Sequence, residues 1–353
     1  MPLLQFIPAA AFLLGLAASA QADDVGVREI DVAAPKRERR LAVTVWYPAK
    51  AGGKPVLVGD NRIFEGSPAW KNAPLRQGRY PLVVLSHGSG GRVEAMSWLA
   101  TDLAAAGFIV AGPNHPGTTS GDSTPANTPK LWERTADLAA LIDVFTRDPQ
   151  WSAAIDPERI AVLGFSLGGS TAMEISGARA SLDAYADYCD SYGKWDCAWF
   201  VGGRGYVGDA PVDVDKLDLR TVDKARFEQS NRDSRVKSAV LVDPGLAQAY
   251  VEDSLKAIAI PMHFINLGNK ETVPLAVASE PLAALTPKGS YATVAGADHF
   301  SFLPICKEGA AELLETFGEV DPICGTTERP RADIHAEISK LTREALQKTL
   351  ADR

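Results

Sequence analysis

The sequence predicts an α/β fold in which a mostly parallel central sheet is covered by helices on both faces. Short apolar segments alternate with helical ones along most of the chain, and this order is typical of parallel sheets because each crossover needs a helix. Residues 80–86 are apolar almost without a break, which indicates a strand buried on both faces. With 353 residues, of which 46% are hydrophobic and 23% charged, the chain can bury the core that such a sheet needs.

The first half of the chain supplies the centre of the expected sheet. Residues 40–47 alternate and are rich in β-branched side chains, so we expect an antiparallel entry pair with residues 27–32. A polar loop rich in Ser, Thr, Pro and Gly follows at 118–129. The remaining elements expected here are strands at 80–86, 108–111 and 160–163, and helices at about 93–106, 131–145 and 170–175.

The second half resumes the same alternation after one interruption. Residues 178–235 are rich in Tyr, Trp, Gly and Asp and break the rhythm, so we interpret them as an insertion that forms a lid or cap over the site. The alternative is a surface excursion with a small aromatic core of its own. Beyond the insertion we expect strands at 236–242, 262–267 and 291–294, and helices near 246–253, 307–317 and 332–350.

The N-terminus has the composition of an export signal. Residues 1–22 carry no charged side chain, residues 3–18 are apolar, and Ala20-Gln21-Ala22 forms a small-x-small cleavage signal. We therefore predict a cleaved signal peptide at 1–22, a mature domain at 23–353 and a periplasmic or secreted location. An uncleaved membrane anchor is the alternative, although the apolar run is short for a span.

The four cysteines are consistent with export. Their spacing suggests two local disulfides, Cys189–Cys197 and Cys306–Cys324, which an oxidising compartment permits. A zinc site is the competing interpretation, but the close Cys-x₂₋₄-Cys clusters or paired histidines that it requires are missing from the sequence. We expect neither a metal nor a cofactor.

The net charge of −8 argues against nucleic acid as a partner, because phosphate binding needs a basic surface. The one basic run, residues 36–40, is expected to be a solvated strand edge. Apart from residues 1–22, no segment resembles a membrane span. The sequence does not define the oligomeric state.

Gly164-Phe165-Ser166-Leu167-Gly168 is the strongest chemical signal in the chain. A Gly-x-Ser-x-Gly turn between a strand and a helix exposes a serine hydroxyl as a nucleophile, and the flanking glycines leave room for the tight turn. Here an apolar strand precedes the motif and a run of small residues follows it. The sequence therefore predicts Ser166 as a nucleophile.

A serine nucleophile needs backbone N–H donors that stabilise the oxyanion. One donor should be Leu167, directly after Ser166 and at the start of a helix. The second should come from His87-Gly88-Ser89-Gly90-Gly91, the glycine-rich loop after the first central strand. Ser89 is the expected donor there.

The base follows by elimination, because the chain has only five histidines. His263 and His335 fall inside predicted elements and are expected to be structural. His87 and His115 follow early strands, whereas the base of a Ser…Asp…His order follows the last strand. His299 has that position.

Two carboxylates compete for the third position. Asp243 ends the strand predicted at 236–242, where a side chain points into the crevice at the carboxyl edge of the sheet. Glu271 follows the next strand but lies several residues beyond its end. Asp298 is too close to His299 in sequence to orient it. The position favours Asp243 and leaves Glu271 as the alternative.

Several stretches together resemble the plasma and type II intracellular platelet-activating-factor acetylhydrolases and the related bacterial "predicted dienelactone hydrolases". The resemblance covers about residues 40–317 and implies the α/β-hydrolase fold. In that family the acid ends the strand before the last two, which corresponds to Asp243, and the residue after His-Gly donates to the oxyanion, which corresponds to Ser89. Ser166 stands where dienelactone hydrolases proper carry Cys. The matching stretches are 86–90, 107–111 with Asn114-His115, 164–169, 241–243 and 263–266.

These observations predict an exported serine carboxylic ester hydrolase that forms an acyl-enzyme on a short-chain, small or lipid-like ester. Polyester or aromatic-ester hydrolysis and amide or peptide cleavage are the enzymatic alternatives, because the same triad performs them all. A catalytically silent fold used for binding is the alternative from another class.

Overall fold

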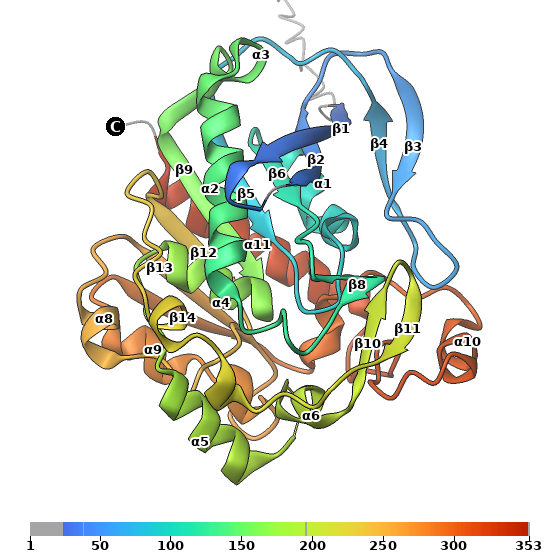
Figure 1. The fold of residues 1–353 in the computed structure, drawn as a ribbon. Coiled ribbons are helices and arrows are strands. Elements are labelled where there is room, and N and C mark those ends of the chain that lie inside the picture. The colour runs from blue at the N-terminus through green and yellow to red at the C-terminus, as the bar shows by residue number, and fades with distance from the viewer. Residues whose placement is uncertain (1–23, 38, 195, 352–353) are drawn as a thin grey trace, which may run out of the picture.

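The computed structural model describes residues 24–37, 39–194 and 196–351. The predicted signal peptide lies outside these residues. A ten-stranded sheet forms the centre of the molecule, with strand order β14-β13-β12-β9-β5-β6-β2-β1-β4-β3 (Figure 1). Within the described ranges, no helix is long and apolar enough to cross a bilayer.

Six neighbouring strands of this sheet run parallel, as predicted. The central strand β5 shows why its sequence is continuously apolar: Leu82 and Val84 pack into the core on one face, and Val83 and Leu85 pack into the core on the other. The six strands are β5 (Tyr80–Ser86), β6 (Ile109–Pro113), β9 (Ile155–Phe165), β12 (Ser238–Val242), β13 (Met262–Leu267) and β14 (Gly289–Val294).

The antiparallel entry pair was also predicted correctly. Strand β1 (Val25–Ala34) pairs with β2 (Arg39–Pro48), and β2 in turn pairs antiparallel with β6. A further hairpin, β3 (Lys54–Val58) and β4 (Ser67–Lys71), extends the sheet beyond β1 and was not predicted. Its strands are short, contain Pro and have no clear alternation, as is typical of an edge.

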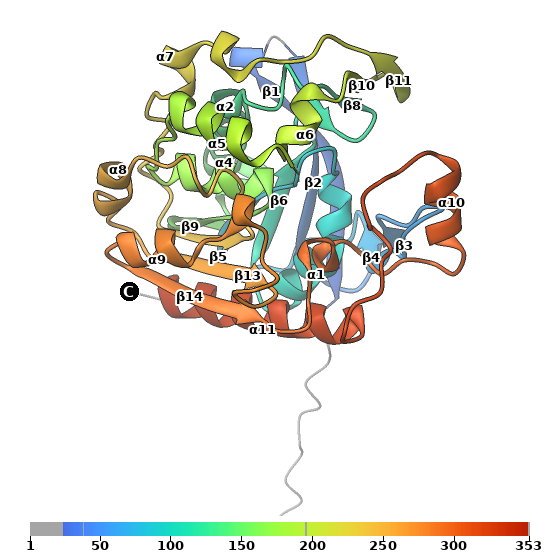
Figure 2. The same ribbon diagram turned by 90° about the horizontal axis from the view of Figure 1, so that it is seen from below.

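Helices cover both faces of the sheet (Figure 2). Buried residues of α1 (Ser97–Ala105) and α11 (Arg331–Thr349) pack into one core. Buried residues of α2 (Leu131–Arg147), α4 (Leu167–Ile175) and α9 (Glu280–Leu285) pack into the core on the other face. The other helical elements of this part are the short η1 (Pro35–Arg37), η2 (Val93–Met96), α3 (Pro149–Ser152), α8 (Glu252–Lys256), η4 (Leu275–Val277), η5 (His299–Phe302) and α10 (Ala310–Thr316).

Three local predictions need correction. The helix expected near 246–253 begins only at Glu252. Leu246 has a positive φ of 56°, which a right-handed helix does not use, and Val251, directly before the helix, is still extended. The helix expected near 307–317 begins at Ala310, after Gly309 in the left-handed region. The expectation of a solvated edge at 36–40 is wrong for Arg37, since its side chain is only 8% exposed and pairs with Glu133 and Asp137.

The insertion, residues 178–235, folds mainly as α5 (Leu182–Tyr192), α6 (Asp196–Val201), the hairpin β10 (Arg204–Val207) with β11 (Ala210–Asp213), η3 (Leu219–Thr221) and α7 (Lys224–Phe227). The segment 118–129, expected to be only a loop, contributes β7 (Thr118–Thr119) and β8 (Asp122–Ser123). These strands form a second sheet of four strands with order β11-β10-β8-β7. The insertion is therefore joined to the loop that follows β6.

Candidate active site

Ser166 occupies a tight turn between β9, which ends at Phe165, and α4, which begins at Leu167. Its φ of 55° and ψ of −122° are unusual for a residue with a side chain. Both flanking glycines are required here by close approach. A Cβ on Gly164 would lie 1.9 Å from the Gly168 carbonyl oxygen, and a Cβ on Gly168 would lie 1.9 Å from the Ser86 carbonyl oxygen.

A chain of hydrogen bonds links Ser166, His299 and Asp243. The Ser166 Oγ lies 3.1 Å from the His299 Nε2, and the His299 Nδ1 lies 2.8 Å from the Asp243 Oδ2. These three residues are far apart in the sequence and follow different strands of the same sheet edge. The structure thus brings together the nucleophile, base and acid that the sequence predicts.

The Asp243 carboxylate is buried and held on its second oxygen by two donors. The Asn266 Nδ2 and the Leu267 backbone N–H donate to Oδ1 at 2.7 and 2.9 Å, respectively. Glu271, the alternative acid, lies in an exposed turn after β13. The His299 Nδ1 is therefore oriented by Asp243.

The loop that carries His299 is fixed by Asp298. The Asp298 Oδ1 accepts hydrogen bonds from both the backbone N–H and the hydroxyl of Ser301 at 2.8 Å, and the Ser301 hydroxyl accepts one from the Asp298 N–H. This capping box opens the short helix η5 at His299. Phe165 stacks on the imidazole with ring centroids 4.8 Å apart, so the ring is held from its face as well.

Sequence reasoning missed Asn266 and the capping role of Asp298. Asn266 also accepts hydrogen bonds from the backbone N–H and hydroxyl of Ser279, so it ties three segments to the acid. An asparagine inside the apolar run of β13 was the available signal, because a buried amide must find partners.

The glycine loop after β5 lies against Ser166. A Cβ on Gly88 would lie only 3.3 Å from the Ser166 Cβ. The Gly88 carbonyl accepts hydrogen bonds from the His87 Nδ1 and the Gly91 backbone N–H at 2.8 and 3.1 Å. Since a trans peptide is planar, this fixes the Ser89 N–H in the opposite direction. Leu167 is the first residue of α4, and the backbone N–H groups of a helix's first turn have no carbonyl partner within the helix.

The two turns meet where the strand order of the parallel sheet reverses. From β5 the chain continues to β6 on one side of it, and then returns to β9 on the other side. The reversal therefore lies between β5 and β9. In α/β sheets such a switch point leaves a crevice at the carboxyl edge between the two strands. The Ser89 loop and Ser166 follow the strands on the two sides of this point.

The insertion packs against the nucleophile turn. Leu167 belongs to a buried apolar cluster that it shares with α2 and with the insertion. The members from the insertion include Tyr185 and Phe200, whose rings meet edge to face at 5.8 Å. The residue next to Ser166 is therefore part of the core beneath the insertion.

The cysteines form the two expected pairs. The sulfur atoms of Cys189 and Cys197 lie 2.07 Å apart between α5 and α6, and those of Cys306 and Cys324 lie 1.97 Å apart around α10. Each paired loop carries a carboxylate, Asp196 or Asp321, and burial raises the pKa of both. The Tyr185 hydroxyl donates to Asp196 at 2.7 Å.

The four other histidines have structural partners in the body of the protein. His263 is bonded to the Ser290 hydroxyl, and His335 stacks on Trp98 and lies within hydrogen-bond distance of two carbonyls. Burial lowers the pKa of His87 to about 3 and the pKa of His335 to about 4. Across the described ranges, no cluster of His, Cys, Asp and Glu side chains could hold a metal ion.

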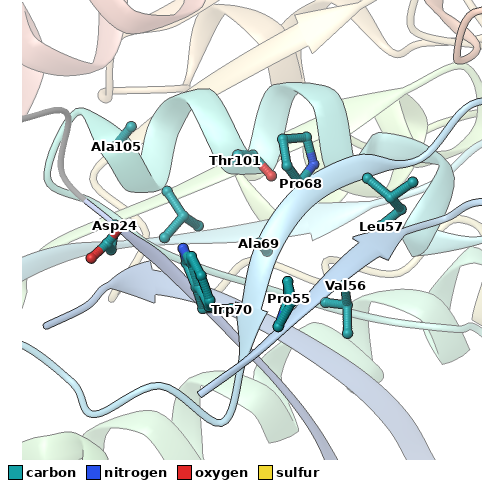
Figure 3. Close-up of a pocket in the computed structure, with 10 residues that line it drawn as sticks. Asp24, Pro55, Val56, Leu57, Pro68, Ala69, Trp70, Thr101 and Ala105 are labelled. Atoms are coloured by element: carbon teal, nitrogen blue, oxygen red, sulfur yellow. The ribbon is translucent and has the colours of Figure 1, made fainter. Parts of the chain in front are cut away.

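An open, largely apolar pocket of about 540 Å³ lies at the β3 end of the sheet, away from Ser166, Asp243 and His299. Figure 3 shows it between the β3–β4 hairpin and α1, with Trp70 and Leu57 on the hairpin side and Thr101 and Ala105 on the helix. None of its lining residues belongs to the two glycine turns or to the triad.

A model of the Alpha/beta hydrolase family matches residues 83–313, which is more than half of the chain. The chain belongs to this family. The fold is also that of a ferulic acid esterase from Streptomyces cinnamoneus, with a TM-score of 0.60, 17% sequence identity and coverage of 96% of this chain and 93% of the other.

Curated relatives match this member of the family over shorter stretches. Platelet-activating factor acetylhydrolase from Canis lupus familiaris is 40% identical over 94 residues, which are 23% of this chain and 21% of the relative. The protein of the same name from Bos taurus is 27% identical over 40% of this chain and 44% of its own. A bis(hydroxyethyl) terephthalate hydrolase from Streptomyces coelicolor is 28% identical over 34% and 36%, respectively. The chain thus spans less than half the length of each of these relatives.

Proposed function

We propose that this protein is a serine hydrolase that cleaves carboxylic esters through an acyl-enzyme on Ser166. The observation that carries the proposal is the hydrogen-bonded chain from Ser166 through His299 to Asp243, with the serine presented on a strained turn. A serine hydroxyl becomes nucleophilic when an oriented imidazole can take its proton. The partial relatives whose names describe ester hydrolysis support the same chemistry.

Each step follows from the position of these groups. The His299 Nε2 takes the Ser166 proton while the hydroxyl oxygen attacks the ester carbonyl, and Asp243 stabilises the imidazolium that forms. The amides of Leu167 and Ser89 stabilise the oxyanion. His299 then protonates the leaving alcohol, and water repeats the sequence to release the acid. Every proton moves between named groups, so the reaction requires no further co-reactant than water.

We further propose that the insertion acts as a cap that selects the substrate, which we expect to be a short-chain or otherwise small ester. Leu167, the residue next to Ser166, lies in an apolar cluster with residues of the insertion, which supports a role of this segment beside the site. The aromatic content of the insertion, with Tyr188 and Trp199 only partly buried, favours aromatic esters as the second candidate substrate. The terephthalate ester in the name of one relative points the same way.

Export of the mature chain is part of the proposal. The apolar segment at 1–22 supports it at the sequence level. The two cysteine pairs at disulfide distance support an oxidising compartment. N-terminal sequencing of the secreted or periplasmic protein is expected to begin near Asp23.

The function is tested with purified protein, p-nitrophenyl acetate and a fluorophosphonate probe. Wild type is expected to hydrolyse the ester and to be labelled on Ser166, while Ser166→Ala loses both activities by a factor of about 10³ or more in a folded protein. Ser234→Ala removes an exposed serine as a matched control and is expected to keep both. Turnover by Ser166→Ala near the wild-type rate would contradict the proposal, and a folded wild type that is neither active nor labelled would favour a binding protein.

A substrate panel then separates the candidate classes. Short alkyl esters, long-chain esters, an aromatic ester, polyester film and an anilide present the same carbonyl chemistry to different access routes. Highest kcat/KM on short esters supports the first candidate, and preference for the aromatic ester or the film supports the second. Preference for the anilide would overturn the assignment to esters in favour of an amidase.

A further inference from the structure

Arg134 is a buried cation that the catalytic steps do not use. It projects from α2 and is only 1% exposed. Its Nη2 donates to the His87 carbonyl and, at 3.1 Å, to the Ser86 hydroxyl. Its Nε donates to the Thr171 Oγ1 at 2.9 Å, and its Nη1 donates to the Thr118 Oγ1 at 2.6 Å. The guanidinium therefore joins three segments that surround the nucleophile.

Two of these bonds reach the neighbourhood of the two expected oxyanion donors. The His87 carbonyl belongs to the peptide immediately before the one that carries the Ser89 N–H. On the other side, the Thr171 hydroxyl donates to the Leu167 carbonyl at 3.1 Å. Because peptide units are rigid planes, anchoring an adjacent unit limits how far each donor can turn. One planar guanidinium thus links both donors by fixed, directional bonds.

A second Ser–His–Asp chain holds this cation in place. The Ser86 Oγ lies 3.0 Å from the His115 Nε2, and the His115 Nδ1 lies 2.9 Å from the Asp137 Oδ2. All three side chains are fully buried, so no substrate can reach this serine. The nearby Asp137 opposes the effect of burial on the pKa of Arg134, and burial raises the pKa of Asp137 itself from 3.8 to about 7. The Asp137 Oδ1 also lies 3.2 Å from the Arg37 Nε.

The pKa shifts of His115 and Arg134 indicate which hydrogen bonds of this network each group donates and accepts. Burial and the adjacent Arg134 hold the pKa of His115 well below its usual value, so the ring is neutral. Its Nδ1–H then donates to Asp137 and its Nε2 accepts the Ser86 hydroxyl proton, which leaves the Ser86 oxygen free to accept from Arg134. Burial lowers the pKa of Arg134 to about 9, so it is charged at neutral pH.

We propose that Arg134 is a positioning residue that holds the Ser89 and Leu167 amides at the mutual geometry that the oxyanion requires. The inference rests on the ester hydrolase proposed above. Donors that stabilise a transition state act through their preorganised direction, so small rotations reduce catalysis without weakening substrate binding. Loss of the Arg134 bridge is therefore expected to lower kcat and to leave KM nearly unchanged.

The sharpest test removes one hydroxyl of the bridge. Thr171→Val keeps the shape of the side chain but loses both the acceptor for the Arg134 Nε and the donor to the Leu167 carbonyl. We expect a fall in kcat of about tenfold, which is less than the loss of an entire donor. Thr171→Ser retains the hydroxyl and is expected to recover most of kcat. Arg134→Lys keeps the charge but cannot make the same forked contacts, and a larger fall of about a hundredfold is expected.

The matched control is Thr286→Val. Thr286 is also buried, and its hydroxyl donates to the Leu282 carbonyl at 2.9 Å at the C-terminal end of α9. Like Thr171→Val, Thr286→Val removes a buried hydroxyl that donates to the carbonyl four residues earlier. We expect its kcat to stay at the wild-type value. Circular dichroism and thermal unfolding give the folded fraction of each variant.

A tetrahedral analogue distinguishes positioning from general damage. For Thr171→Val, the inhibition constant of a boronic acid, which forms an oxyanion on Ser166, should rise by the factor by which kcat falls. The inhibition constant of a substrate isostere without an electrophilic carbonyl, such as the corresponding ether, should not change. Unchanged boronate affinity in the folded protein, or a wild-type kcat for Thr171→Val, would overturn the inference. If wild type itself neither turns over esters nor binds the boronate, it is the proposed function that fails.

Discussion

Asp243→Asn is the substitution whose outcome the geometry determines most closely. The Asp243 Oδ1 accepts hydrogen bonds from Asn266 and from the Leu267 backbone, so the amide oxygen of the new side chain must stay at that position. The amide nitrogen then replaces Oδ2 and donates to the His299 Nδ1. This places the imidazole proton on Nε2, which faces Ser166 and can no longer accept the hydroxyl proton.

The expected fall in kcat follows from the hydrogen bonds that are lost when the amide of the new side chain turns over. Turning the amide over restores the working tautomer but leaves two buried donors facing an NH₂ group, at about 1 to 3 kcal/mol each. The total of about 2 to 6 kcal/mol corresponds to a fall in kcat between about 30-fold and about 3 × 10⁴-fold. The same substitution in the triad of a serine protease costs about 10⁴, near the upper end of this range.

The assay measures kcat and KM for p-nitrophenyl acetate in wild type, Asp243→Asn and Glu271→Gln. We expect a fall in kcat with little change in KM for the first variant and no change for Glu271→Gln, because Glu271 lies in an exposed turn. If Asp243→Asn is folded and retains kcat within about threefold, the tautomer argument is wrong. A large loss in Glu271→Gln alone would move the role of the acid to Glu271.

Three further substitutions test the stability of the framework. Burial raises the pKa of Glu174 from 4.5 to about 8. The folded state therefore keeps a proton that the unfolded chain loses above pH 4.5, and stability falls by about 1.4 kcal/mol per pH unit up to pH 8. Glu174→Gln is expected to remove this dependence. A wild-type protein with the same urea midpoint at pH 5 and pH 8 would contradict the prediction. Gly164→Ala is expected to yield no active, folded protein, because its Cβ would lie 1.9 Å from a backbone oxygen; normal expression and turnover would show that the turn can relax. Replacing Cys189 and Cys197 by Ser opens a loop with a sequence separation of 8, which costs about 2 kcal/mol, and limited proteolysis should cut the insertion faster than in wild type. Unchanged proteolysis would mean that the apolar cluster alone holds the insertion.

The sequence predicted the parallel sheet well because its strands are buried on both faces. Strands 80–86 and 262–267 were predicted to the residue, since each is an apolar run that begins and ends at a Pro, Gly or polar residue. Edge strands lack this signal. Residues 67–71 include a proline and a lysine, and they pair with β1 and β3 through contacts between distant segments that the sequence does not encode locally.

Within the site, the order of elements along the chain was sufficient to select Ser166, Asp243 and His299, which meet in the structure. The residues that orient them were not predictable, because their partners come from distant segments. Asn266 reaches the acid from a neighbouring strand, and Arg134 reaches the glycine turns from a helix. Neither contact leaves a pattern in the nearby sequence.

The pairing of Tyr206 with Ser123 has a practical consequence for attempts to redesign this protein. It continues one small sheet from the insertion into the segment whose Thr118 carbonyl accepts the Gly90 amide, so the insertion is not a detachable module. A chimera that exchanges residues 178–235 as a block would also disturb the turn beside the nucleophile. Transfer of specificity from another family member should therefore carry 118–124 and the insertion together.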